Sequence, residues 1–401
     1  MTTKNANMTG DENGISRRAI LQKIGSAGFG TAAIGAVSGQ GSADIAYDPN
    51  RERPYTAFLK NVSTNNGNIK RKKIQKTIPR DEWIRRYTAI DLRNTIAENL
   101  RQSKRIASLD QITVGFVQTE ESPTDFGVEV EYQVEQLPNG TQKKPDVSIE
   151  TLRSILPHSG TGSLSDTDAQ YKRQNIPVHV SKRTNSRICT YYGNDYETVP
   201  GGSMIRNSDS TKFSTLNTAF HANKFNENGW ITAAHAVDSN RQPLYHRSSS
   251  DRLGIVRQRS LSSDIDICFV RRDSNEYSSA TVTSPDGSDK QYPVGGIVTD
   301  AELNNHVGDS SYETWTQGRT TCRTSGEIVK TLGFWGGTSA VVTTQSVDNG
   351  DSGGPLFVKR TNEYGTTEAF MAGNVFAKTS GGNCKSTTAE TTENKLDGYF
   401  Y

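Results

Sequence analysis

The stretch Asp348-Asn349-Gly350-Asp351-Ser352-Gly353-Gly354-Pro355-Leu356-Phe357 carries the strongest signal in the chain. A serine becomes a nucleophile only if a base removes its proton and donors receive the resulting oxyanion. Glycines on both sides of Ser352 permit the tight backbone path that directs N–H groups into one hole. A plain turn between two strands is the alternative, and a match of this length makes it the weaker one. We therefore expect Ser352 to be a nucleophile.

A single histidine follows an apolar, strand-like run upstream of this motif. Gly229-Trp230-Ile231-Thr232-Ala233-Ala234 ends at His235. A general base must lie within hydrogen-bond reach of the nucleophile, and small neighbouring side chains allow another strand to approach that closely. Taken alone, such a histidine is usually a core or surface residue, but its place ahead of the serine motif favours a base. The histidines without a comparable setting are His158, His179, His221, His246 and His306.

The third member should be a buried carboxylate that fixes the imidazole tautomer. The run from Ser262 to Val270 offers Asp264 and Asp266. Asp266 is followed by an apolar, a small, an apolar and a valine residue, and we favour it for this reason. Residues two apart share one face of a strand, so periodicity alone leaves Asp264 open.

Composition favours a polar, turn-rich β protein. Hydrophobic residues make up 32% of the 401 residues, and there are 36 glycines and 13 prolines. The 46 basic and 44 acidic side chains give a net charge of +2, which argues against a nucleic-acid partner bound through counterion release. A mean hydropathy of −0.67 excludes a multi-span membrane protein. The scattered cysteines and histidines lack zinc-ligand spacing, so we expect no metal.

Residues 1–43 predict an export signal. Arg17-Arg18 precede a weakly apolar run from Ile24 to Val37, and small residues follow around Ser42. This order is typical of a twin-arginine signal, and the run is too short and polar to span a bilayer. We therefore expect a secreted, extracellular protein without stable membrane insertion. A disordered basic N-terminus is the alternative interpretation.

The next part of the chain predicts a small α+β region, residues 45–156. Helical periodicity runs from Asp81 to Ile106, and apolar residues alternate from Phe126 to Val134. A short helix is expected from Val147 to Leu156. Residues 157–176 are rich in Gly, Ser, Thr and Asp and predict a linker.

From residue 177 onward, short β-branched or aromatic runs alternate with turn residues, which predicts a barrel or sandwich. The motifs at His235, Asp266 and Ser352, in this order, resemble the chymotrypsin/trypsin superfamily of serine endopeptidases. Thr321–Gly326 and Thr379–Cys384 are similar to its prokaryotic secreted, streptogrisin-like branch, whose members commonly carry a removable pro-region. The resemblance covers roughly residues 177–401.

The resemblance implies an all-β fold of two antiparallel six-stranded barrels, at about 177–280 and 290–401, preceded by the small α+β region. Residues 45–156 would then be a pro-region that assists folding or blocks the cleft, removed by cutting near residues 157–187. The alternative is an accessory binding domain that stays attached.

The resemblance also implies the roles of the site residues. His235 would be the general base, Asp266 its orienting acid and Ser352 the nucleophile, with the oxyanion held by the N–H groups of Gly350 and Ser352. Ser346 would lie at the base of the specificity pocket, where a neutral residue favours medium or large apolar side chains over Arg or Lys. Substrates would be proteins or peptides, without a cofactor. A binding protein with this fold that turns over no substrate, or cleaves only itself, is the alternative.

The sequence departs from the family pattern at its cysteines and at the start of the first barrel. No cysteine follows His235 or precedes Gly350, so the family's disulfides cannot all form. Four cysteines allow three complete pairings, and Cys268, inside an apolar run, is expected to be a buried thiol. Because no Ile-Val-Gly-Gly start is present, we do not expect activation by a new N-terminus that pairs with Asp351.

Overall fold

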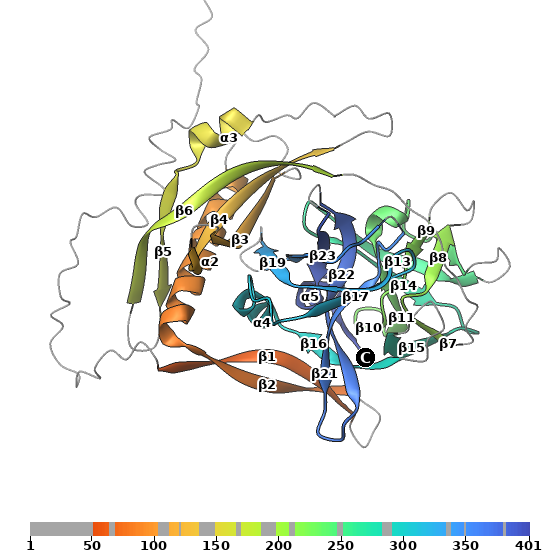
Figure 1. Ribbon diagram of the computed structural model, residues 1–401. Coiled ribbons are helices and arrows are strands. Elements are labelled where there is room, and N and C mark those ends of the chain that lie inside the picture. The colour runs from red at the N-terminus through yellow and green to blue at the C-terminus, as the bar shows by residue number, and fades with distance from the viewer. Residues whose placement is uncertain are drawn as a thin grey trace, which may run out of the picture.

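Strands dominate the architecture. The computed structural model describes residues 51–63, 69–102, 112–119, 122–135, 149–165, 170–185, 198–207, 213–246, 252–282, 291–333, 338–348, 350–379 and 382–401. Two curled sheets follow an α+β region, which confirms the expected fold class (Figure 1). The predicted export signal, residues 1–43, lies outside the described residues. Within the described residues, every helix is too short or too polar to cross a membrane.

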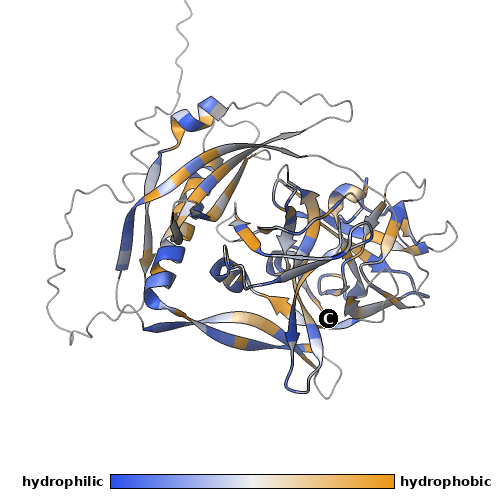
Figure 2. Cartoon of the chain, viewed as in Figure 1, coloured by the Kyte–Doolittle hydropathy of each residue, from blue (hydrophilic) through white to orange (hydrophobic). Residues whose placement is uncertain are grey.

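The N-terminal unit consists of a long hairpin, a helix and a curved sheet. The hairpin strands β1 (Glu52–Ser63) and β2 (Ile69–Pro79) lead directly into α2 (Arg80–Gln102). The first turn of the helix contains Asp81 and Glu82, whose negative charges interact favourably with the positive N-terminal end of the helix dipole. It covers a sheet of β3 (Ile112–Thr119), β4 (Ser122–Glu135), β5 (Ser159–Ser165) and β6 (Gln170–Asn185), while α3 (Ile149–Ile155) lies before β5. Figure 2 shows hydrophobic residues on α2 and on the strands beside it.

The segment expected to be a linker is part of this sheet. Residues 157–176 contain β5 and the first part of β6, which pair antiparallel. A Cβ atom at Gly160 would lie 2.5 Å from Leu92 Cδ1, and one at Gly162 would collide with the carbonyl of Thr88. Glycine is therefore required here because helix α2 packs closely on the strand, not because the segment is flexible. The linker prediction is wrong, and the N-terminal unit extends to Asn185.

The first barrel is a sheet of eight strands, in the order β24-β10-β11-β14-β13-β12-β8-β9, and not of the six expected. Its strands run from β8 to β14, with β24 added from the region assigned to the second barrel. Strand β24, which comes last in the sequence, forms one edge of this sheet and pairs with β10. Trp230 and Val270 lie in its fully buried core. The strands are β8 (Met204–Asn207), β9 (Phe213–Thr215), β10 (Ala219–Ala222), β11 (Glu227–Thr232), β12 (Pro243–Tyr245), β13 (Arg252–Leu261), β14 (Asp266–Arg272) and β24 (Gly398–Phe400).

The second barrel consists of strands in the order β18-β17-β21-β22-β23-β20-β19. Strands β7 (Thr198–Gly201), β15 (Tyr277–Val282) and β16 (Tyr292–Val298) extend this sheet, because β16 pairs with β22, β15 with β16 and β7 with β15. Helices α4 (Asp300–Asn305) and α5 (Ala389–Leu396) contact its strands. Its strands are β17 (Thr314–Gly318), β18 (Cys322–Gly326), β19 (Ile328–Leu332), β20 (Ala340–Thr343), β21 (Pro355–Thr361), β22 (Thr367–Lys378) and β23 (Cys384–Thr388).

The N-terminal unit and the second barrel share sheets and a hydrophobic core. Strand β3 pairs with β19, where Phe116 lies opposite Thr331, and β1 pairs with β16. The rings of Phe58 and Phe370 meet edge to face with their centroids 5.2 Å apart. Both side chains belong to one cluster that also contains Ile96 of α2. The two parts therefore stabilise each other through continuous apolar contacts.

Replacing Phe58 by alanine tests this shared core. We expect Phe58→Ala to lower the free energy of unfolding by about 3–5 kcal/mol, because it removes a buried ring that packs across the boundary between the two parts. Urea denaturation followed by tryptophan fluorescence measures this loss. Tyr364→Ala is the control, because this side chain is 85% exposed and its removal should cost under about 0.5 kcal/mol. Equal losses for the two variants would contradict a shared core.

Candidate active site

His235 is held by Asp266 at two points. Strand β11 ends in the short 3-10 turn Ala234–Ala236, which presents the histidine beside the start of β14. The backbone N–H of His235 donates to Asp266 Oδ1 over 3.0 Å, and its Nδ1 lies 2.6 Å from Asp266 Oδ2. Since a carboxylate accepts, the proton of the ring lies on Nδ1 and Nε2 is left as the basic nitrogen.

The second barrel fixes the backbone on either side of this carboxylate. The N–H of Asp266 donates to Thr387 Oγ1 over 3.0 Å, and Asn374 Nδ2 donates to the Asp266 carbonyl over 3.2 Å. Sequence reasoning missed both residues. Asn374 carries a signal, because it is a polar residue inside the apolar run of β22, whereas Thr387 lies among other threonines and carries none.

The structure distinguishes the two candidate carboxylates. Asp264 is also buried, but it accepts hydrogen bonds from the hydroxyl groups of Ser262 and Ser339. Asp266 is the carboxylate that contacts His235. The two side chains are therefore engaged by different partners, and the residue beside His235 is the one that the sequence favoured.

The serine turn requires glycine at two positions. Gly350 and Gly353 have φ values of +95° and +90°, in the region that side chains strongly disfavour. A Cβ atom at Gly353 would also collide with the Thr215 carbonyl and the Thr232 hydroxyl. The serine turn thus packs against Thr232, the last residue of β11, which lies three residues before His235.

The first barrel also holds the backbone of Ser352. Its carbonyl accepts hydrogen bonds from the Thr215 N–H, over 2.8 Å, and from the Ser214 hydroxyl. Within the described residues, the N–H groups of Gly350 and Ser352 donate to no backbone carbonyl. These are the two groups expected to form the oxyanion hole, and this role stays a prediction.

The hydroxyl of Ser352 faces the end of β22. Ser352 Oγ lies 3.5 Å from the carbonyl oxygen of Phe376, which is a weak contact. Among the described residues, no hydrogen bond joins Ser352 to His235. Both nevertheless border one cluster, in which the Phe376 side chain packs with Ala233 and Ala236. Catalytic hydrogen bonds are often long without substrate, and rotation of Ser352 about χ1 redirects its hydroxyl.

Asp351 is buried beneath the serine turn and already fully engaged. Its carboxylate accepts from the N–H groups of Thr320, Thr321 and Asp348 over 2.7, 3.2 and 2.8 Å, and from the Thr321 hydroxyl over 2.7 Å. Burial raises the pKa of Asp351, and these hydrogen bonds oppose that shift. Both carboxylate oxygens are thus occupied by groups of the second barrel, without a contribution from a chain terminus.

Ser346, expected at the base of the specificity pocket, has an exposed side chain. Its carbonyl accepts from Thr324 Oγ1 over 3.0 Å. The residues on either side, Gln345 and Val347, are the buried ones. The pocket role of Ser346 stays a prediction.

The cysteines with described side chains are thiols. Cys268 and Cys384 are both free and buried, which confirms the expectation for Cys268. Burial raises the pKa of Cys384 to about 12, so this thiol is inert near neutral pH. Cys189 and the side chain of Cys322 lie outside the described residues. In the described part of the chain, the His, Cys, Asp and Glu side chains form no group of three that suits a metal ion.

Solved structures with a similar arrangement are serine proteases. The crystal structure of Cellulomonas bogoriensis chymotrypsin is 18% identical, with a TM-score of 0.38, and the match covers 51% of this chain and 98% of that chain. Thermobifida fusca protease A is 19% identical, with a TM-score of 0.38 and coverage of 50% and 97%. A glutamic acid specific serine protease, described as using a novel histidine triad in substrate binding, is 17% identical, with a TM-score of 0.39 and coverage of 51% and 100%.

No family model and no curated protein sequence matches this chain. The identities and TM-scores of the solved structures are low, so the chemistry inferred for this chain depends on its own contacts: the two-point hold on His235 and the glycine-lined serine turn.

Gly353→Ala tests the packing of the serine turn. Gly365→Ala is the matched control, because Gly365 has a similar φ of +80° but nothing within 4 Å of an added Cβ atom. We expect the control to lose about 1–2 kcal/mol from backbone strain alone. The additional collision with the first barrel should make Gly353→Ala lose several kcal/mol more, measured by thermal unfolding. Equal losses would show that the turn does not pack against β11.

Proposed function

We propose that this chain is an exported serine endopeptidase that cleaves peptide bonds through an acyl-enzyme. The observation that carries the proposal is the two-point hydrogen bonding of Asp266 to His235, beside a turn that presents Ser352. A histidine with a fixed tautomer, a buried carboxylate hydrogen-bonded to it and a serine on a tight, glycine-flanked turn are the parts that activate an alcohol.

In the proposed mechanism, His235 acts first as base and then as acid in each half-reaction. His235 Nε2 takes the proton of Ser352 Oγ as this oxygen attacks the substrate carbonyl, and Asp266 stabilises the imidazolium that forms. The proton then passes to the leaving amine, the C–N bond breaks and an ester to Ser352 remains. Water then attacks the ester carbonyl as His235 takes its proton, the bond to Ser352 Oγ breaks, and His235 returns the proton to this oxygen, which releases the acid product. The N–H groups of Gly350 and Ser352 stabilise the oxyanion, and loss of one such donor costs about 10²–10³ in rate.

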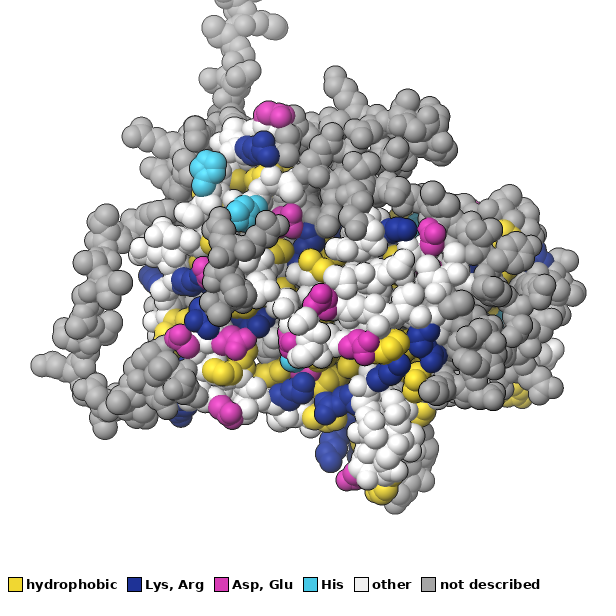
Figure 3. Space-filling model, in the orientation of Figure 1, with side chains coloured by type: hydrophobic (Ala, Val, Ile, Leu, Met, Phe, Trp, Pro, Cys, Tyr) yellow, Lys and Arg dark blue, Asp and Glu magenta, His cyan; other side chains and the backbone are white. Residues whose placement is uncertain are grey.

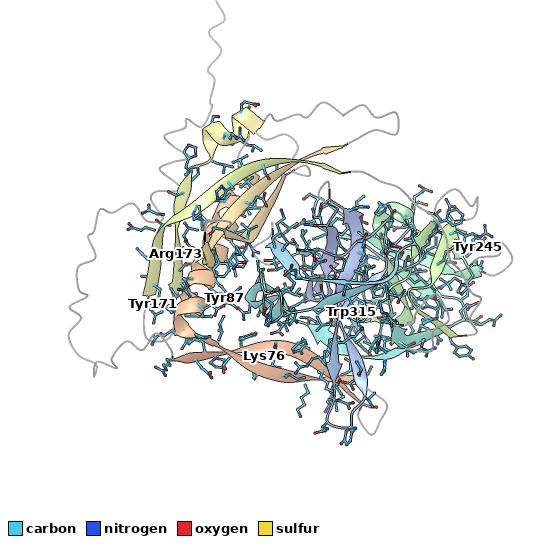
Figure 4. All side chains as sticks on the ribbon, in the orientation of Figure 1. Lys76, Tyr87, Tyr171, Arg173, Tyr245 and Trp315 are labelled. Atoms are coloured by element: carbon cyan, nitrogen blue, oxygen red, sulfur yellow. The ribbon has the colours of Figure 1, made fainter. Side chains whose placement is uncertain are left out.

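We also propose that the enzyme is made as a precursor whose N-terminal unit folds against the catalytic part. Basic groups of this unit meet carboxylates of the catalytic part: Lys76 Nζ lies 2.5 Å from Glu302 Oε1, and Arg71 pairs with Glu393. Figure 4 shows Lys76 on the β1–β2 hairpin. On the face drawn in Figure 3, basic and acidic side chains likewise lie intermingled. Such pairs suit a partner that is held firmly before it is removed.

The strands β5 and β6 change the expected position of the cut. Because residues 159–165 and 170–185 are paired in a sheet, we place the processing site at residues 186–197, between β6 and β7. Mass spectrometry of the secreted protein should therefore find a catalytic chain that begins within this segment. A mature chain that begins near residue 44 would contradict removal of the N-terminal unit and favour an attached accessory domain.

A second candidate function is binding without turnover. The orientation of the Ser352 hydroxyl, toward Phe376 and not toward His235, is the observation that favours it. A binding protein of this kind would hold peptides between the barrels and release them uncleaved.

Asp266→Asn separates these two functions. An amide at residue 266 no longer fixes the required tautomer, so we expect kcat for a peptide substrate to fall by about 10⁴-fold. Ser352→Ala should abolish acyl-enzyme formation. Asp273→Asn is the control, because Asp273 pairs with Arg252 at the surface. An exported protein that binds peptides but hydrolyses none in the unmutated form would instead support binding without turnover.

A further inference from the structure

The N-terminal helix α2 inserts one fully buried cation into the catalytic part. Arg93 is 1% exposed and lies on a helix face with Ala89, Ile96 and Ala97, which are equally buried. A charged side chain in such surroundings loses its hydration, and it is retained only where partners compensate. Burial lowers the pKa of Arg93 to about 10, whereas the charges of Asp300 and Asp264 raise it.

The hydrogen bonds of Arg93 are made to neutral groups. Its Nε and Nη2 donate to Asn94 Oδ1 over 3.2 and 2.9 Å, and its Nη1 lies 3.4 Å from Thr338 Oγ1. The carboxylates whose charges raise the pKa of Arg93, Asp264 and Asp300, both belong to the catalytic part. Arg93 is thus a cation of the N-terminal unit that contacts Thr338 of the catalytic part.

A short path leads from Thr338 to the candidate triad. The next residue, Ser339, donates its hydroxyl hydrogen bond to Asp264 Oδ2. The Ser339 carbonyl accepts a hydrogen bond from the N–H of Thr388. On the neighbouring residue, Thr387 Oγ1 accepts a hydrogen bond from the N–H of Asp266. Asp264 and Asp266 therefore have their positions fixed by adjoining residues of two segments, 338–339 and 387–388.

We propose that Arg93 is a positioning residue for the candidate triad: through Thr338, Ser339 and Asp264, it keeps the segment that carries Asp266 in register with His235. The inference rests on the proposed function and deepens it. The N-terminal unit then organises the triad in the uncut chain, before its proposed removal.

The physical reason is the fixed position of a buried side chain. Arg93 Nη1 contacts Thr338 Oγ1, and the hydroxyl of the next residue, Ser339, donates to Asp264. Without the guanidinium, residues 338–339 lose this contact. A shift of this segment alters the hydrogen bond between Ser339 and Asp264 and displaces the backbone two residues before the Asp266–His235 contact. Displacements of about 1 Å at a catalytic group lower rates by about 10²-fold.

The experiment compares Arg93→Met with the unmutated full chain labelled with ¹⁵N-histidine. The Nδ1–H signal of His235, identified by its loss in His235→Gln, reports on the bond to Asp266 whether or not the protein hydrolyses anything. We expect Arg93→Met to shift or broaden this signal, and to lower kcat by roughly 10–100-fold while KM stays within about twofold. Arg93→Lys should recover most of the signal, because lysine restores the positive charge, although it lacks the planar guanidinium group.

Arg85→Met is the matched control, since Arg85 lies on the same helix and pairs with Asp81 at the surface. An Arg93→Met protein with the unmutated imidazole signal and kcat would overturn the inference. If the unmutated chain shows the signal but no hydrolysis, the proposed enzymatic function fails, while the signal in Arg93→Met still decides the inference.

Ser339→Ala keeps the test valid if Arg93→Met does not fold. This variant leaves Arg93 in place and removes only the hydroxyl that links residue 339 to Asp264. We expect it to disturb the His235 signal in the same direction. An undisturbed signal in Ser339→Ala would break the proposed path and overturn the inference.

Discussion

The hydrogen bonds between Asp266 and His235 are the constraint on which the site depends. A carboxylate that accepts from both the backbone and the ring of one histidine fixes the position and the tautomer of the imidazole together. Such a carboxylate must be buried, and the backbone that carries it must be fixed by hydrogen bonds. Thr387 and Asn374 of the second barrel do this for a residue of the first barrel. Residues of both sheets thus position His235, the candidate base.

The serine turn crosses the same boundary in the opposite direction. Ser352 belongs to the second barrel, but its carbonyl is held by Ser214 and Thr215 of the first. The N-terminal unit adds a third part, because β3 extends the sheet at β19 and α2 contributes to the common core. Each candidate catalytic group is therefore positioned by an element distant from it in sequence, which ties the chemistry to the integrity of the whole fold.

The sequence predicted the local features and missed the contacts between distant segments. Periodicity found α2 and the strands of both barrels, and spacing and residue type singled out His235 and Ser352. It favoured Asp266 without excluding Asp264, because residues two apart can share one strand face. In the structure, β14 begins at Asp266, and Asp266 is the carboxylate that contacts His235. Gly160 and Gly162 resembled linker glycines, since the helix that packs on them is far away in the chain. Arg93 carried no signal, because its charge partners lie in another unit.

Labelling with a fluorophosphonate tests the central claim most directly, because this reagent modifies only a serine that a neighbouring base has activated. Peptide mapping of the labelled protein should locate one phosphonyl group, on Ser352, and labelling should fail after denaturation. An unlabelled Ser352 in the folded, processed protein would contradict the claim that His235 and Asp266 activate this residue.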